Sequence, residues 1–167
     1  SWTVSGSNAT VNANTSTIII NNSSLFVTTF AGGGKTYNNV KINNNNGLNT
    51  NITGNNTFNQ MYFTGAGTGT MSITGTNTFT DFKDDGSAAH SILFTAGTTQ
   101  TVTTFTVSGT AGNLITINSD TTATHALTKS GGGVISSDYL SIQHSVASPA
   151  STWYAGTNST DNQAVAT

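Results

Sequence analysis

The sequence predicts an all-β protein, namely a right-handed parallel β-solenoid with coils of about 21 residues. Three observations lead to this fold class. The composition suits strands and turns, apolar strand centres recur at short regular intervals, and a seven-residue motif returns after 21 positions. An antiparallel β-sandwich or jelly roll, which also has short strands at regular spacing, is the alternative.

The composition favours strands joined by tight turns. Thr (34), Asn (21), Ser (19) and Gly (18) make up more than half of the 167 residues. Thr, Val, Ile and Phe pack well on a pleated surface, whereas strong helix formers are scarce, with no Glu, no Arg and four Lys. Asn and Gly tolerate positive φ and therefore supply the turns. We expect almost no helix.

Charge and cysteine content exclude several classes of function. Without Cys the chain can form neither a disulfide framework nor a thiolate metal site. Nucleic-acid binding depends on Lys and Arg that neutralise phosphates, and this chain has a net charge of −2 and no Arg. The longest aliphatic run, residues 18–20, is too short to span a membrane. We therefore expect no nucleic-acid partner and no membrane insertion.

The strongest internal signal is the repeated motif. Residues 52–58 (Ile-Thr-Gly-Asn-Asn-Thr-Phe) return at 73–79 with six of seven positions identical. In a parallel stack, residues one coil apart lie directly above each other, about 4.8 Å away. Phe58 is then expected to stack on Phe79, with the same relation between the two motif asparagines. A sandwich gives no reason for an identity at this spacing, so the motif favours the solenoid.

Two interleaved series of apolar residues mark the expected strand centres. Steps of 21 define the first series, which contains Ile52, Ile73, Phe94 and Ile115. The second series begins at Ile42 and Phe63, fails at Asp84, and resumes at Phe105. The register drifts before residue 40 and after residue 120, so the repeat is regular only in the middle of the chain.

The ragged ends are expected to cap the stack, because an exposed terminal coil is an open edge. We predict a single β-domain over residues 1–167. Within it, residues 1–35 form an N-terminal cap region, 36–137 the regular coils, and 138–167 a C-terminal cap or contact region. The only two tryptophans, Trp2 and Trp153, fall in the end regions.

Longer stretches resemble a known class of repeat. These are residues 30–40 (Phe-Ala-Gly-Gly-Gly-Lys-Thr-Tyr-Asn-Asn-Val), 94–102, 107–114, 138–143 and the Trp-Tyr-Ala-Gly-Thr-Asn-Ser-Thr-Asp stretch at 153–161. Their order is similar to Thr/Asn/Gly-rich β-strand-repeat segments in large surface proteins of environmental bacteria and in virion proteins of tailed phages. The resemblance implies an extracellular, structural or adhesive role and carries over no catalytic residue. Such segments often continue beyond the Trp-Tyr-Ala-Gly stretch, and the end at residue 167 suggests a small free-standing protein.

Asp84 and Asp85, with Lys83 and His90, form the only charged cluster. Two carboxylates can cleave a glycosidic bond or bind Ca²⁺. Neighbouring strand residues point to opposite faces, however, so this pair would converge only in a turn. The following Gly86 favours a solvated Asp-Asp-Gly loop, and we assign the cluster no function.

The remaining candidates also carry no assigned chemistry. The three histidines, His90, His125 and His144, are scattered without the spacing of a metal site, and we expect them on the surface or in strands. The aromatic residues Tyr139, Trp153 and Tyr154 suit a core cap or a subunit contact, or alternatively sugar stacking. Thr-x-Thr pairs such as Thr76/Thr78 and Thr101/Thr103 would form hydroxyl rows on a solenoid. We expect no catalytic residue, no cofactor and no metal ion.

The function expected from these observations is that of a non-catalytic structural or decoration protein on the outside of a virion, associated with tail or capsid. Its partners would be virion or cell-surface proteins, including further copies of itself, and a glycan is a further candidate. The alternative is a bacterial extracellular adhesin or matrix module, located at the cell surface, that binds glycans or itself. A polysaccharide-degrading β-helix enzyme is a distant third, because acidic residues are few and Arg is missing.

Overall fold

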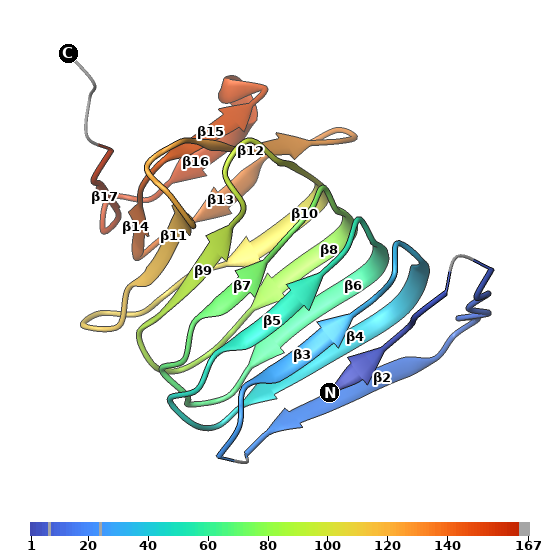
Figure 1. Ribbon diagram of the computed structural model, residues 1–167. Helices are drawn as coiled ribbons and strands as arrows, with labels where there is room; N and C mark the ends of the chain where they lie inside the picture. Colours follow the sequence, from blue (N-terminus) through green and yellow to red (C-terminus); the bar gives the residue numbers. More distant parts are fainter. Residues whose placement is uncertain (7, 24, 164–167) are drawn as a thin grey trace.

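The computed structural model describes residues 1–6, 8–23 and 25–163, and it shows a parallel β-solenoid (Figure 1). The chain makes about seven turns of roughly 22 residues each. All pairings between named strands are parallel, so the solenoid is confirmed and the antiparallel alternative is wrong. The described residues contain no α-helix and one 3-10 turn, Ala150–Thr152.

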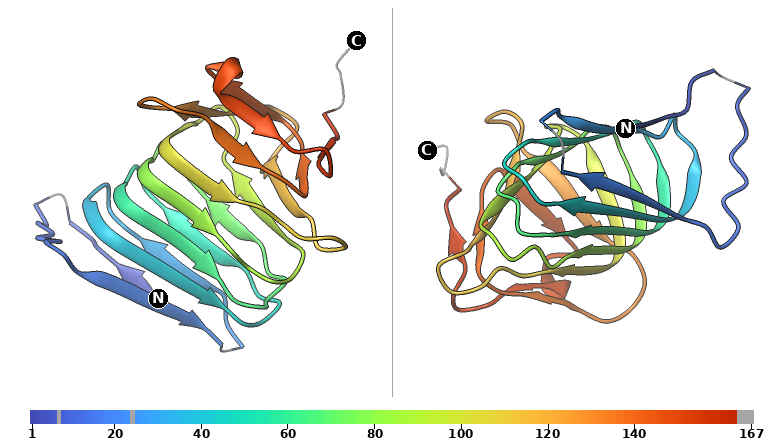
Figure 2. Two further views of the ribbon diagram at one scale, coloured as in Figure 1. Left: turned by 180° about the vertical axis from the view of Figure 1, so that it is seen from behind. Right: turned by 90° about the horizontal axis from the view of Figure 1, so that it is seen from below.

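Two sheets face each other across the core. Sheet A has eight strands, in the order β1 (Trp2–Thr3), β3 (Thr28–Ala31), β5 (Thr50–Thr53), β7 (Met71–Ile73), β9 (His90–Phe94), β11 (Ile115–Ser119), β14 (Leu140–Ile142) and β17 (Thr160–Asp161). Sheet B has seven, in the order β15 (Ser145–Ser148), β12 (His125–Lys129), β10 (Thr99–Val107), β8 (Thr78–Asp84), β6 (Thr57–Thr64), β4 (Thr36–Asn44) and β2 (Thr17–Asn22). Figure 2 shows both sheets from behind and from below.

A third, small sheet completes the C-terminal end of the stack. It pairs β13 (Ile135–Ser137) with β16 (Trp153–Ala155) in parallel. Strand β13 lies in the connection from β12 in sheet B to β14 in sheet A. At the other end of the stack, the connection between β2 and β3 runs between the same two sheets.

The repeated motif occupies equivalent places in successive coils, as the sequence predicts. Phe58 pairs with Phe79 in the β6–β8 ladder, and their rings stack with centroids 5.3 Å apart and planes 7° apart. The backbone N–H of Asn56 donates to Oδ1 of Asn77 at 2.8 Å. The identity between the two motifs therefore reflects a parallel ladder in which like lies on like.

Each motif asparagine closes the turn in which it lies. The side-chain amide of Asn56 donates to the carbonyls of Thr53 and Gly54, so the buried turn is hydrogen-bonded by its own asparagine. The glycines of the two motifs, Gly54 and Gly75, have φ of 105° and 83°. Side chains rarely adopt this conformation, which explains why Gly stands third in the motif.

The register departs from the spacing of the motif in the second half of the stack. Phe94 pairs with Ser119, and Ile115 pairs with His90, so partners there lie further apart in the sequence than the two motifs do. The step from Phe94 to Ile115 was therefore a wrong assignment. Longer turns at 108–114 and 120–124 add the extra residues without disturbing the parallel ladder.

The second apolar series was also misassigned. Asp84 does not interrupt it, because Asp84 pairs with Phe63 on one side and with Val107 on the other. Phe105 pairs instead with Phe82. The column inside sheet B thus runs unbroken, with one buried carboxylate in an otherwise apolar row.

Aromatic contacts connect the two ends of the core. Each ring touches the next, with centroid separations from 5.1 to 6.5 Å, and the chain of contacts runs Trp2, Phe30, Phe58, Phe79, Phe82, Phe105 and Trp153. Phe30, Phe58, Phe79 and Phe82 are almost completely buried. The two tryptophans therefore lie at opposite ends of one aromatic core, where large apolar rings supply much of the burial that this polar chain allows.

Candidate functional site

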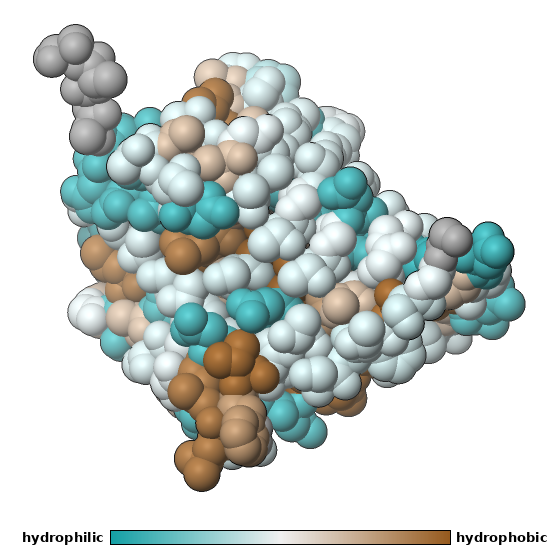
Figure 3. Space-filling model, in the orientation of Figure 1, coloured by the Kyte–Doolittle hydropathy of each residue, from teal (hydrophilic) through white to brown (hydrophobic). Residues whose placement is uncertain are grey.

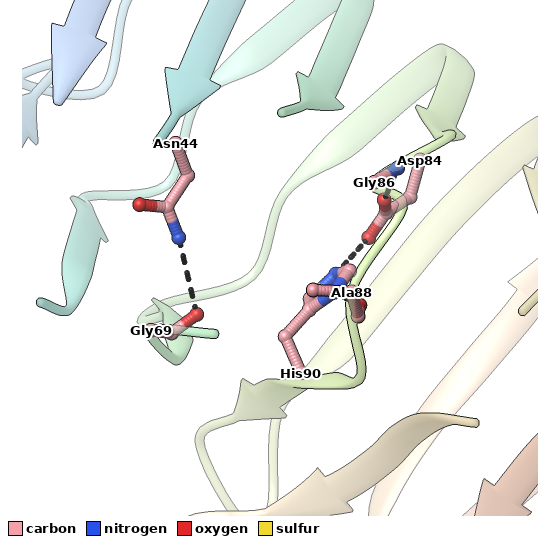
Figure 4. Close-up of polar contacts among 6 residues, drawn as sticks. All are labelled: Asn44, Gly69, Asp84, Gly86, Ala88 and His90. Atoms are coloured by element: carbon pink, nitrogen blue, oxygen red, sulfur yellow. Dashed lines mark hydrogen bonds and ion pairs between the residues drawn. The ribbon is translucent and has the colours of Figure 1, made fainter. Parts of the chain in front are cut away.

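The charged cluster found in the sequence separates into a buried part and an exposed part. Asp84 ends β8 and His90 begins β9, and the turn between them brings the two side chains together inside the stack (Figure 4). Nε2 of His90 lies 2.7 Å from Oδ2 of Asp84, and both side chains are fully buried. The expectation of a solvated Asp-Asp-Gly loop is therefore wrong for Asp84.

Backbone groups complete the buried pair. The N–H of Gly86 donates to Oδ1 of Asp84 at 2.9 Å, and Nδ1 of His90 lies 2.8 Å from the carbonyl oxygen of Ala88. A buried charge is tolerated only when it is paired and hydrogen-bonded, and both conditions hold here. Burial by itself would lower the pKa of His90, but the hydrogen bond and charge of Asp84 outweigh it, and the pKa is raised.

Asp85 turns to the outer face of sheet B. Its carboxylate accepts a 2.6 Å hydrogen bond from the Tyr62 hydroxyl and lies 3.4 Å from Nζ of Lys83. Two ammonium groups, those of Lys41 and Lys83, lie 4.9 and 4.6 Å from the centroid of the Tyr62 ring. Asp84 and Asp85 thus face opposite sides of the sheet, as strand geometry predicts, and they cannot flank one glycosidic bond.

A second buried histidine lies at the opposite edge of the coils. His125, at the start of β12, is held between the hydroxyls of Ser119, 2.8 Å from Nδ1, and Ser145, 3.0 Å from Nε2. Burial lowers its pKa to about 4, although Asp120 partly opposes the effect. His90 and His125 are both buried, which corrects the expectation of surface histidines. Within the described ranges no three His, Cys, Asp or Glu side chains are grouped to hold a metal ion.

The aromatic residues of the C-terminal region surround a cavity of about 510 Å³. The cavity opens at the end of the stack, between the last strands of both sheets and the β13–β16 pair. Its walls are mainly apolar and include Phe105, Ile117, Leu127, Ile135, Leu140, Ile142, Trp153 and Tyr154. Trp153 packs on Phe105 and Tyr154 is exposed, whereas Tyr139 lies in the turn before β14 and outside the cavity lining.

One polar group in the cavity wall has no partner. The Ser137 side chain is only 5% exposed, and its hydroxyl makes no hydrogen bond within the described part of the chain. It alternates with Ile135 on the inward face of β13. An unsatisfied buried hydroxyl costs free energy, so a group that reaches this point and bonds to Ser137 would be favoured.

Exposed apolar side chains are confined to the two ends of the molecule. At the N-terminal end they are Trp2, Ile19, Leu25, Phe26 and Val27, and at the C-terminal end Val134, Val146 and Tyr154. From residue 28 to residue 133 no large hydrophobic side chain is exposed. Figure 3 shows an apolar patch at the lower end of the view, over the turn between β2 and β3.

The sequence analysis missed the most exposed of these residues. Leu25, Phe26 and Val27 follow three polar residues and lie in a turn, where the composition elsewhere places Asn, Gly and Ser. Leu25 is 90% and Phe26 is 76% exposed. Three consecutive large apolar residues in a turn position were the available signal.

The long outer faces carry regular threonine hydroxyls instead. One column on sheet B contains five residues in register, namely Thr36, Thr57, Thr78, Thr101 and Thr128. Of the predicted Thr-x-Thr pairs, Thr78 and Thr101 thus lie one above the other, whereas Thr76 belongs to a turn. The sides of the stack are therefore polar and nearly uncharged.

Comparisons with known proteins identify no relative. No protein-family model matches the sequence, and neither the curated proteins nor the solved structures gave a match. The described residues contain no helix long and apolar enough to cross a membrane.

Proposed function

We propose that the chain is a non-catalytic structural module displayed on the outside of a virion, where it decorates the tail or capsid. The observation that carries the proposal is the distribution of surface types. A stack with polar, nearly uncharged sides presents all its exposed large apolar side chains, over the described residues, at its two ends. Exposed apolar patches of this kind mark protein contacts.

The charged residues support a structural role over an enzymatic one. Among the described residues, the one buried carboxylate–histidine pair lies inside the core, closed off from solvent by the coils on either side. The neighbouring Asp85 points outward and is already engaged by Tyr62 and Lys83. A glycosidase needs two carboxylates that face each other across an accessible substrate, and Asp84 and Asp85 do not meet that requirement.

A bacterial adhesin or matrix module is the second candidate, and the threonine column on sheet B favours it. Five hydroxyls in register, about 4.8 Å apart, form a regular surface that could bind the hydroxyls of a polysaccharide. The overall composition and the resemblance to Thr/Asn/Gly-rich repeat segments are compatible with either location.

A cryo-EM map of the native particle or fibre that carries the chain tests the proposal. A virion map with solenoid density seated on tail or capsid is the expected result. Cells that display the chain on their own surface, with purified virions free of it, would refute the virion role and leave the adhesin as the better explanation.

A further inference from the structure

The two ends of the stack differ in shape as well as in sequence. The N-terminal end carries a protruding apolar turn, which we call the first-turn loop and define as Leu25, Phe26 and Val27. The C-terminal end carries the cavity of about 510 Å³ described above, which we call the end cavity. A protrusion and a hollow, both apolar, therefore lie at opposite ends of one molecule.

Both features lie on the same side of the coil. The first-turn loop belongs to the connection from β2 in sheet B to β3 in sheet A. The end cavity is walled by β13, which belongs to the connection from β12 in sheet B to β14 in sheet A. If a second molecule is placed on the first by continuing along the axis of the stack, its first-turn loop comes to the side of the end cavity.

The backbone edges agree with this placement. In the described ranges, β1 and β2 are the outer strands of sheets A and B at one end, and β17 and β15 at the other. Every ladder in both sheets is parallel. A molecule continued along the axis therefore brings β1 next to β17 and β2 next to β15 in the same parallel sense, and open edges of this kind pair readily.

We propose that copies of this chain associate head to tail, with the first-turn loop of one copy inserted into the end cavity of the next. The occupant is a second copy because protrusion and cavity are at opposite ends, so that one molecule cannot satisfy both. The volume of the cavity admits large apolar side chains, and the backbone of the inserted loop brings polar groups toward the unpaired Ser137 hydroxyl.

The arrangement has two consequences. The contact is heterologous, so repeating it produces a row or filament instead of a closed dimer, unless a rotation between copies closes a ring. The contact also depends little on salt. The first coil has no Asp or Lys before Lys35, and among the residues that line the cavity only Asp161 is charged.

Sedimentation velocity over a range of chain concentrations provides the first test. We expect association whose midpoint concentration changes less than about threefold between low and moderate salt. The double variant Leu25→Asn/Phe26→Asn should raise that midpoint at least about tenfold, because it removes the apolar groups that are buried. The matched control is Leu93→Asn, which replaces an outward-facing leucine in the middle of sheet A. It should leave the midpoint unchanged, and far-UV circular dichroism checks that both variants fold.

Disulfide trapping gives the direction of the contact. The described chain has no free cysteine and the sequence contains none, so single cysteines report cleanly. One chain carries Phe26→Cys, and another carries Ala150→Cys at the exposed rim of the cavity. A mixture should form a disulfide-linked pair many times faster than either variant alone. Equally fast linkage of Phe26→Cys with itself would show head-to-head contact and overturn the proposal.

Removal of residues 164–167 separates the second-copy occupant from the chain's own end. If association appears only after this removal, the cavity belongs to that segment and the proposal is wrong. A chain that stays monomeric at every concentration, with or without the segment, overturns it as well. The inference deepens the proposed structural function and rests on it, but the two fail separately. Monomers found singly on a virion refute only the stacking, and stacking chains absent from virions refute only the location.

Discussion

The core of the stack predicts a large effect for Phe79→Ala. Phe79 is 1% exposed and lies between two rings, stacked on Phe58 at 5.3 Å and edge-on to Phe82 at 5.1 Å. Truncation to Ala removes the transfer free energy of the ring and leaves a cavity, which together cost about 3–5 kcal/mol. Because coils above and below are held in ladder register, the site cannot collapse freely, and the upper half of that range is expected.

Urea unfolding followed by circular dichroism measures this loss, with Thr157→Ala as the control. Thr157 is exposed in the turn before β17, so its replacement should cost less than about 0.5 kcal/mol. Repeat stacks can unfold in parts, so the slope of the transition is compared between variants before free energies are subtracted. Equal losses at Phe79 and Thr157 would refute the idea that the aromatic core in mid-chain carries the stability.

Three further predictions concern buried polar groups and a turn. Because the pKa of His125 is lowered to about 4 in the folded chain, against 6.5 when unfolded, its stabilising effect is present above pH 6.5 and is lost as the pH falls toward 4. The loss approaches about 3 kcal/mol in pH-dependent melts and should shrink in His125→Gln. Asp84→Asn should cost about 3–5 kcal/mol and Asp84→Leu/His90→Leu much less, because the double change leaves no unpaired charge. The raised pKa of His90 makes the single loss larger at pH 6 than at pH 9, where a neutral histidine needs no carboxylate. Gly75→Ala should cost more than about 1 kcal/mol by urea melts, because a Cβ would lie 2.7 Å from the Gly54 carbonyl oxygen at a φ of 83°. A thermal midpoint unchanged in any of these variants would contradict the stated contact.

The fold could be predicted because a parallel ladder imposes identity at one fixed distance. Residues that lie above each other share burial, turn geometry and hydrogen-bond partners, so Phe58 and Phe79, or Asn56 and Asn77, come to be alike. The prediction weakened where turns changed length. Nothing in the spacing of Phe94 and Ile115 indicates that the true partners lie further apart in the sequence, because turns at the coil edge can lengthen without altering either strand.

The position of Asp84 shows a different limit. A charged residue at a core position contradicts the apolar pattern, and the pattern was abandoned there instead of the assumption that carboxylates are exposed. The count of 21 from Phe63 reaches Asp84, and the ladder keeps that count. His90, a short turn later, was the available sign of a buried partner, since that turn returns the chain to the opposite sheet.

The candidate site at the ends was less accessible to sequence reasoning. The first-turn loop leaves a visible signal, a Leu-Phe-Val run at a turn. The end cavity leaves none, because it depends on how the β13–β16 pair is placed against the last strands of both sheets. Apolar residues at 135, 140 and 142 read as ordinary strand centres, and only the three-dimensional arrangement shows that the space between them is unfilled.

The same ladder that stabilises the middle of the stack determines where it can associate. Between the ends, each strand of the two described main sheets has a neighbour on both sides, and inward apolar groups are covered by the next coil. In these sheets only the outermost strands have unpaired edges, and it is at these ends that large apolar side chains reach the surface. Substitutions inside the stack, such as Phe79→Ala, should therefore lower stability and leave the association midpoint unchanged while the chain stays folded. Substitutions in the first-turn loop should do the reverse, since Leu25 and Phe26 contribute little to a core from which they protrude.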